Sequence, residues 1–209
     1  MADTNSTYPV SLSVDYKVEE RDKLTTFFRL FVAIPILIIL SLLARGSLDW
    51  EYAAWSLGTA PAGVIFLPTL LMILFRQKYP KWWFDWNLAL TRFGLRVAAY
   101  VTLLRDEYPS TDEEQSVHLD IAYPDAATEL SQGLPLVKWL LAIPHLFILA
   151  FLSIAVFACV VAAWFVILFT GRLPEALADF IVGYMRWEVR VMAYAFLLTT
   201  DIYPPFSLD

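Results

Sequence analysis

The sequence has a single cysteine, only two histidines and only seven glycines in 209 residues. Cys159 has no partner for a disulfide within the chain, and its place in an apolar run indicates a small buried side chain. His118 and His145 stand in different contexts, so their spacing indicates no metal site. The sequence shows no glycine-rich phosphate loop and no nucleophile–base spacing, which argues against an enzyme or a bound cofactor. The N-terminal stretch also lacks the basic and apolar regions of a cleaved signal peptide.

Apolar residues are abundant, at 59% of the chain. Soluble domains contain about 45–50%, so the excess predicts surface that faces a lipid bilayer. The formal net charge of −6 argues against a nucleic-acid partner.

One stretch of the sequence occurs twice, at residues 75–109 and again at residues 169–204. Both copies have a basic turn with proline, then a helix-forming segment rich in aromatic residues, and both close on Tyr-Pro. Six identities share an offset of 94 residues, namely Phe75/Phe169, Pro80/Pro174, Asp85/Asp179, Arg92/Arg186, Arg96/Arg190 and Tyr100/Tyr194. Upstream, the Ala-Ile-Pro at residues 33–35 recurs 109 residues later. We therefore predict two repeats, 1–109 and 110–209, with about 109 − 94 = 15 residues missing between the apolar segments of the second.

Two short segments, residues 8–16 and 116–123, alternate apolar and polar side chains. In the first, Val10, Leu12 and Val14 alternate with serine and aspartate, and the second repeats this pattern with valine, leucine and isoleucine. Period-two alternation with β-branched residues predicts half-buried strands. Because an open sheet edge cannot face hydrocarbon, we expect both strands outside the bilayer.

Long apolar runs predict the membrane crossings. Residues 27–43 and 53–75 are each close to the ~20 residues that cross a hydrocarbon core. The apolar sequence at 134–169 would form a single helix of about 54 Å, too long for a ~30 Å core. We therefore predict two short helices with a tight turn near residues 152–155. The alternative is one kinked and steeply tilted helix.

The segment after each predicted hairpin is long enough to cross the membrane, but it is charged. Residues 83–104 include one aspartate and two arginines, and each arginine at mid-bilayer costs about 2.5–3.5 kcal/mol. Two crossings per repeat would also keep the basic ends of both repeats on one side, as the positive-inside rule favours. We expect an all-α membrane protein with short extramembrane strands. In it, a transmembrane helical hairpin followed by an interfacial amphipathic helix occurs in tandem.

A polar stripe follows one side of each predicted interfacial helix, within a sector of about 80°. It consists of Asp85, Arg92, Arg96 and Tyr100 in the first copy, and of Asp179, Arg186, Arg190 and Tyr194 in the second. Three interpretations are open. The arginines contact water and phosphates, or the stripes face each other or the strands, with Asp85 pairing with Arg92 or Arg190. The third interpretation is an anion or lipid-headgroup site, since the arginine fork suits phosphate.

His145 directly follows a proline inside the third apolar segment. A polar side chain inside a bilayer is a candidate functional residue. That segment contains no carboxylate, so we expect a hydrogen-bonded structural histidine.

The second half also carries a family resemblance. The motifs are a Pro-His pair, Phe-Thr-Gly-Arg-x-Pro, Arg-Trp-x-x-Arg-Val and a terminal Tyr-Pro-Pro-Phe, all within residues 134–208. This pattern resembles the domain of unknown function family 4389, a group of small bacterial membrane proteins. The first half departs from it, because Ile36 stands where the pattern has histidine and Arg76-Gln77-Lys78 replaces Thr-Gly-Arg. The resemblance implies a bacterial membrane protein and transfers no catalytic residue.

The sequence favours a non-enzymatic protein, an accessory or interaction subunit of a larger membrane complex. Its expected partners are the lipid bilayer and either other membrane subunits or a second copy. The alternative is a transporter or channel for a small solute or lipid, formed between the two repeats. We expect a multi-pass location in the bacterial inner membrane with both termini on the cytoplasmic side.

Overall fold

The computed structural model describes residues 8–18, 21–45, 62–111, 113 and 115–209. Most of these residues are helical. The helices are α1 (Lys23–Arg45), α3 (Ala62–Arg76), α4 (Lys81–Val101), α5 (Pro135–Leu141), α6 (Ile143–Thr170) and α7 (Glu175–Ala195). The strands are β1 (Val10–Val14) and β2 (Val117–Ile121).

The two predicted strands are confirmed. They form one antiparallel pair in which Leu12 lies opposite Leu119. Both strands alternate buried and exposed residues from end to end. One face of the sheet therefore packs on the protein, and the other presents serine, aspartate and histidine side chains to the outside.

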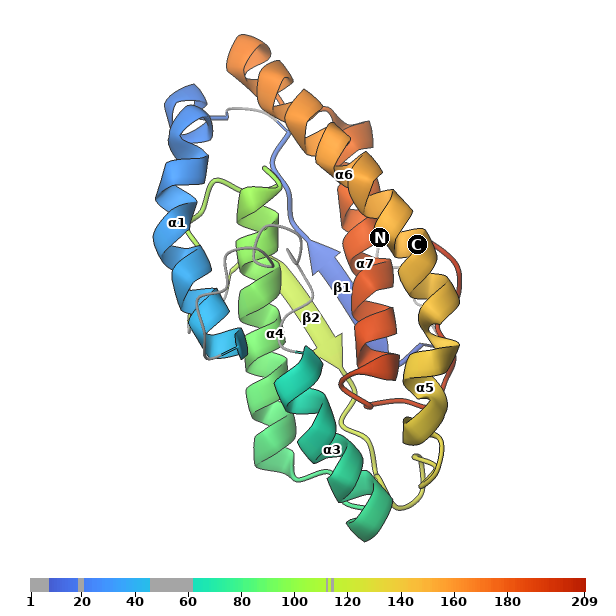
Figure 1. The fold of residues 1–209 in the computed structure, drawn as a ribbon. Coiled ribbons are helices and arrows are strands. Elements are labelled where there is room, and N and C mark those ends of the chain that lie inside the picture. The colour runs from blue at the N-terminus through green and yellow to red at the C-terminus, as the bar shows by residue number, and fades with distance from the viewer. Residues whose placement is uncertain (1–7, 19–20, 46–61, 112, 114) are drawn as a thin grey trace.

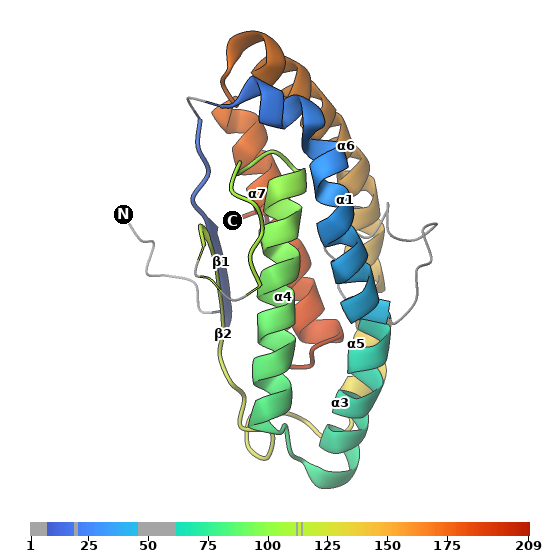
Figure 2. The ribbon, with the colours of Figure 1, turned by 90° about the vertical axis from the view of Figure 1, so that its left-hand side faces the viewer.

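The elements form three layers (Figure 2). The sheet is one outer layer, α4 and α7 form the middle layer, and α1, α3, α5 and α6 form the other outer layer. The middle layer is the centre of the core, because α7 packs on β1 and α6 while α4 packs on β2 and α1.

The predicted tight turn near residues 152–155 is wrong, since α6 runs without interruption from Ile143 to Thr170. The turn segment has neither glycine nor proline, so nothing in it stops a helix. The break falls at Ala142 instead, and Pro144 begins the new helix in the first turn, where a missing N–H costs least. The course of α5 and α6 in Figure 1 is that of one kinked helix, the alternative that the sequence left open.

By length and composition alone, two helices among the described residues could cross a membrane. They are α1, over Lys23–Leu43, and α6, over Ile143–Thr170. The second predicted crossing is shorter than expected, because α3 has 15 residues. The rest of that prediction, residues 53–61, lies outside the described residues.

The middle-layer helices α4 and α7 have the same length, 21 residues. Both follow a proline, and their first residues are 94 apart, as are their last. A leucine two or three residues after each helix takes a left-handed conformation, Leu103 with φ 67° and Leu198 with φ 58°. Figures 1 and 2 show that they run antiparallel, so the α3–α4 turn and the α6–α7 turn lie at opposite ends of the molecule.

Candidate functional site

The first arginine of each polar stripe covers an edge of the sheet. Arg92 of α4 donates from Nε and Nη2 to the Leu119 carbonyl oxygen, at 2.9 and 2.8 Å. Arg186 of α7 donates from Nε to the Leu12 carbonyl oxygen at 3.0 Å. Leu12 and Leu119 form a non-hydrogen-bonded pair, because the bond from Asp15 N to the Ser116 carbonyl fixes the alternation. Their carbonyl groups therefore point to the two open edges, and each arginine satisfies one of them.

The second arginine of each stripe holds the segment that follows its own helix. Arg96 donates to the Ser110 carbonyl oxygen at 3.0 Å, and Arg190 donates to the Ser207 carbonyl oxygen. The tail after α7 also packs closely on Gly183, which has no side chain in the way. An added Cβ there would lie 2.8 Å from the Leu208 carbonyl oxygen. Among the described residues, the stripe arginines thus bind main-chain carbonyl groups.

The stripe aspartates do not pair with these arginines, so the pairing of Asp85 with Arg92 or Arg190, which one of the three open interpretations included, is not found. Asp85 instead accepts from Lys81 Nζ at 3.1 Å, one turn earlier on an exposed surface. Asp179 accepts from the Tyr16 hydroxyl at 2.6 Å. That hydrogen bond to a carboxylate raises the pKa of Tyr16 to about 12.

The stripe tyrosines lie beside two buried cations. Arg29 of α1 is 2% exposed, and its guanidinium lies 4.7 Å from the centre of the Tyr100 ring. It donates to the Tyr100 and Arg105 carbonyl oxygens, at 2.8 and 2.7 Å, and pairs with Asp106. A second arginine, Arg21, lies 3.0 Å from the same carboxylate.

The second cation, Lys138 of α5, is 0% exposed and lies 5.1 Å from the centre of the Tyr194 ring. Its Nζ donates to the Thr200 carbonyl oxygen at 2.6 Å and pairs with Asp201 at 2.7 Å. Both cations lie where a middle-layer helix ends, and the negative end of the helix dipole favours positive charge there.

His145 is fully buried against an aromatic cluster. Its Nδ1 accepts from Trp187 Nε1 at 3.0 Å, which leaves the proton on Nε2. The imidazole stacks on Phe206 with ring centres 3.8 Å apart. Nε2 has no partner among the described residues. At the corresponding offsets, the first half has Ile36 and Phe93, which are also buried.

Sequence reasoning missed Glu188, a buried residue of α7. Among the described residues, its carboxyl group makes no hydrogen bond or ion pair. Burial raises its pKa to about 8. The sequence did hold a signal, because Glu188 lies two positions from both Arg186 and Arg190. Two positions turn a helix by about 200°, so Glu188 lies on the side opposite the polar stripe. The corresponding residue of the first half is Gly94.

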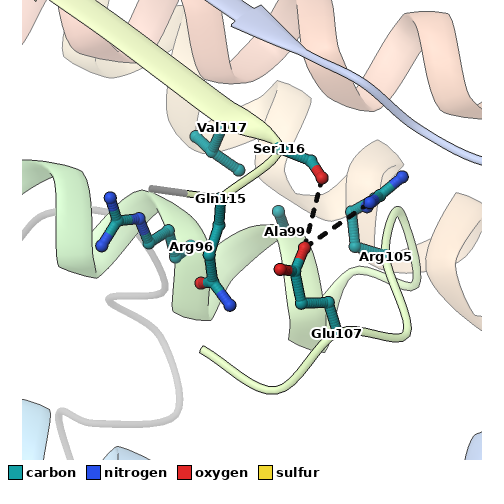
Figure 3. Close-up of a pocket in the computed structure, with 7 residues that line it drawn as sticks. All are labelled: Arg96, Ala99, Arg105, Glu107, Gln115, Ser116 and Val117. Carbon is teal, nitrogen blue, oxygen red and sulfur yellow. Dashed lines mark hydrogen bonds and ion pairs between the residues drawn. The ribbon is translucent and has the colours of Figure 1, made fainter. Parts of the chain in front are cut away.

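A small polar notch lies between α4 and the start of β2 (Figure 3). Glu107 accepts from Ser116 Oγ at 3.2 Å and pairs with Arg105 at 3.5 Å. The cavity volume is about 10 Å³, which is room for about one water molecule. Within the described part of the chain, no group of three His, Cys, Asp or Glu residues could hold a metal ion.

Comparison with known proteins bears on the second half. Residues 135–207 match the model of a family described as a domain of unknown function, DUF4389. No curated protein matches the chain, and no solved structure does.

Proposed function

We propose that this chain, whose second half matches a family of unknown function, is a non-enzymatic membrane protein that serves as an accessory or interaction subunit of a larger membrane complex. The observation that supports this proposal is the apolar surface of the outer helix layer. Large side chains stand exposed along its helices, including Phe31 at 69%, Phe147 at 64% and Phe157 at 70%. Soluble monomers rarely expose apolar patches larger than a few hundred Å².

The polar residues support the same proposal. The arginines that a ligand site would use instead cover sheet-edge carbonyl groups or hold tail segments. The buried cations bind carbonyl groups at or just after the ends of α4 and α7. The notch beside α4 has room for about one water molecule and so admits no substrate. These arginines and buried cations therefore have structural roles, and the outer surface is what remains for interaction.

We include three finer features in the proposal. The first is a tandem repeat at residues 1–109 and 110–209, which the equal lengths and the 94-residue offset of α4 and α7 support. The second is the amphipathic character of α4 and α7. The third is placement in the bacterial inner membrane, where the sequence predicts several crossings and cytoplasmic termini; the accessory role does not depend on that number of crossings.

Co-purification tests the proposal. The tagged chain is extracted from native membranes in two mild detergents, beside a Phe27→Leu/Phe31→Leu variant that keeps the surface apolar but changes its shape. We expect a partner at fixed stoichiometry with the unmodified chain and less of it with the variant. A monodisperse chain that retains no partner in either detergent would contradict the proposal.

A second candidate, a transporter of a small solute or lipid, is favoured by one observation, the unpaired buried carboxyl group of Glu188. Buried ionisable groups in membrane proteins often lie on proton or ion pathways. Solute flux in proteoliposomes that contain the unmodified chain, and loss of that flux in the Glu188→Gln variant, would support transport. Flux with the unmodified chain that equals the flux of empty liposomes would count against it.

A further inference from the structure

We propose that the chain lies flat in a single leaflet of the bilayer, with its long axis along the membrane plane. The helices α1, α3, α5 and α6 would contact the acyl chains of that leaflet, and the sheet would face water. This inference rests on the membrane location proposed above, and it replaces the several crossings that the sequence predicts with an orientation in which no helix crosses.

The two outer layers have opposite chemistry. The helix layer carries the exposed phenylalanines, while the face of the sheet carries exposed serines and charged side chains. The Asp120 side chain is 83% exposed, and that of Asp15 is 73% exposed. Figure 2 shows these layers on opposite sides of α4 and α7. Such a molecule has one lipid side and one water side.

A lengthwise crossing would bring the sheet into the hydrocarbon, because the sheet packs alongside α4 and α7 (Figure 2). The two aspartates would then lose their water. Open strand edges have no place in lipid, since their N–H and C=O groups find no partner there. Along the two strand edges, the stripe arginines cover the carbonyl groups of Leu12 and Leu119.

Helix dimensions fit the flat orientation. A helix is about 10 Å across, and one leaflet offers about 15 Å of hydrocarbon, half of a ~30 Å core. One layer of helices therefore fits within one leaflet. A lengthwise crossing would instead require the outer-layer helices to match the core thickness in length. At 15 residues, α3 spans about 22 Å, whereas α5 and α6 together cover about 54 Å.

The basic turns give an independent argument. The α3–α4 turn carries Arg76, Lys78 and Lys81 beside the exposed Trp82, and the α6–α7 turn carries Arg172. These turns lie at opposite ends of the molecule (Figure 1). A lengthwise crossing would place them on opposite sides of the membrane, against the positive-inside rule. In the flat orientation both turns reach one headgroup layer, where tryptophan, lysine and arginine are favoured.

Cysteine labelling in sealed vesicles of both orientations tests the inference. In a Cys159→Ala background, single variants Lys78→Cys, Glu175→Cys and Ser13→Cys report the two turns and the sheet. Ser153→Cys reports the exposed middle of α6. With a membrane-impermeant maleimide, we expect the first three to react from the same side. Ser153→Cys should react from neither side until detergent is added.

Other outcomes would overturn the inference. Reaction of Lys78→Cys and Glu175→Cys from opposite sides would show a lengthwise crossing. Reaction of Ser153→Cys from either side would show that the middle of α6 is outside the lipid, as in a hairpin whose tip reaches the far face. Alkaline carbonate extraction separates these failures from failure of the proposed function. A chain that stays in the membrane after carbonate treatment is consistent with the proposed function, whatever its orientation. A chain that carbonate releases contradicts both the proposed function and the flat orientation.

Discussion

The two halves of the molecule place different side chains at corresponding positions. In the first half, a buried arginine pair shares Asp106, and the positions that correspond to the histidine–tryptophan pair hold Ile36 and Phe93. In the second half, one buried lysine pairs with one aspartate, and His145 accepts from Trp187. Similar helix geometry thus accepts either an apolar or a hydrogen-bonded core.

The largest expected effect comes from Lys138→Ala in the second half. The substitution leaves the Asp201 carboxylate, 19% exposed, without its cation. Removing one partner of a buried pair costs about 3–5 kcal/mol. We expect a large fall in the thermal midpoint of the purified protein in detergent.

The matched control is Arg29→Ala. Asp106 keeps a second arginine, Arg21, at 3.0 Å, so we expect a smaller loss than for Lys138→Ala. An equal loss in both halves would show that the second arginine does not compensate.

The next effect, a gain, is expected for Glu188→Gln. Burial raises the pKa of this carboxyl group from 4.5 to about 8, so the folded state holds a proton that the unfolded chain releases. Stability is complete below about pH 4.5, falls as pH rises, and reaches its lowest value above about pH 8. The variant should gain on the order of 4 kcal/mol at pH 8 and little at pH 4.5.

Thermal midpoints across this pH range check the prediction, with the exposed Glu175→Gln as control. A gain that does not depend on pH would show that Glu188 is ionised in the folded protein.

Exchanging the core pair of one half for that of the other tests the comparison further. His145→Ile alone leaves the Trp187 indole N–H buried without its acceptor, at a cost of about 1–3 kcal/mol. Adding Trp187→Phe removes the orphaned donor and should recover part of the loss. A double-mutant cycle in thermal midpoints measures the coupling, and strict additivity would contradict the hydrogen bond.

The smallest effect is expected at the sheet edges. Arg92→Ala and Arg186→Ala each remove the donors to one edge carbonyl group, and water at the open edge can take their place. We expect a loss of about 1 kcal/mol for each substitution. Thermal midpoints should agree between the two variants, whereas a large difference would mean that the two edges are not equivalent.

Local patterns in the sequence predicted the local elements. Alternation over Val10, Leu12 and Val14 identified β1, and the paired prolines with their polar stripes identified α4 and α7. Long-range contacts could not be derived in this way. The sequence left open that the polar stripes face the strands, but it could not specify that Arg92 reaches the Leu119 carbonyl, because that contact depends on packing between elements. The break in the third apolar segment was misplaced because Pro144 begins a helix and does not interrupt one.

One measurement tests most directly whether the helix layer faces lipid while the sheet faces water. Spin labels at Phe147→Cys and Ser13→Cys, each in a Cys159→Ala background, are exposed in native membranes to oxygen and to a water-soluble nickel complex. We predict that oxygen relaxes the label at position 147 and that nickel barely reaches it, with the reverse at position 13. Equal nickel accessibility at the two positions would contradict the account.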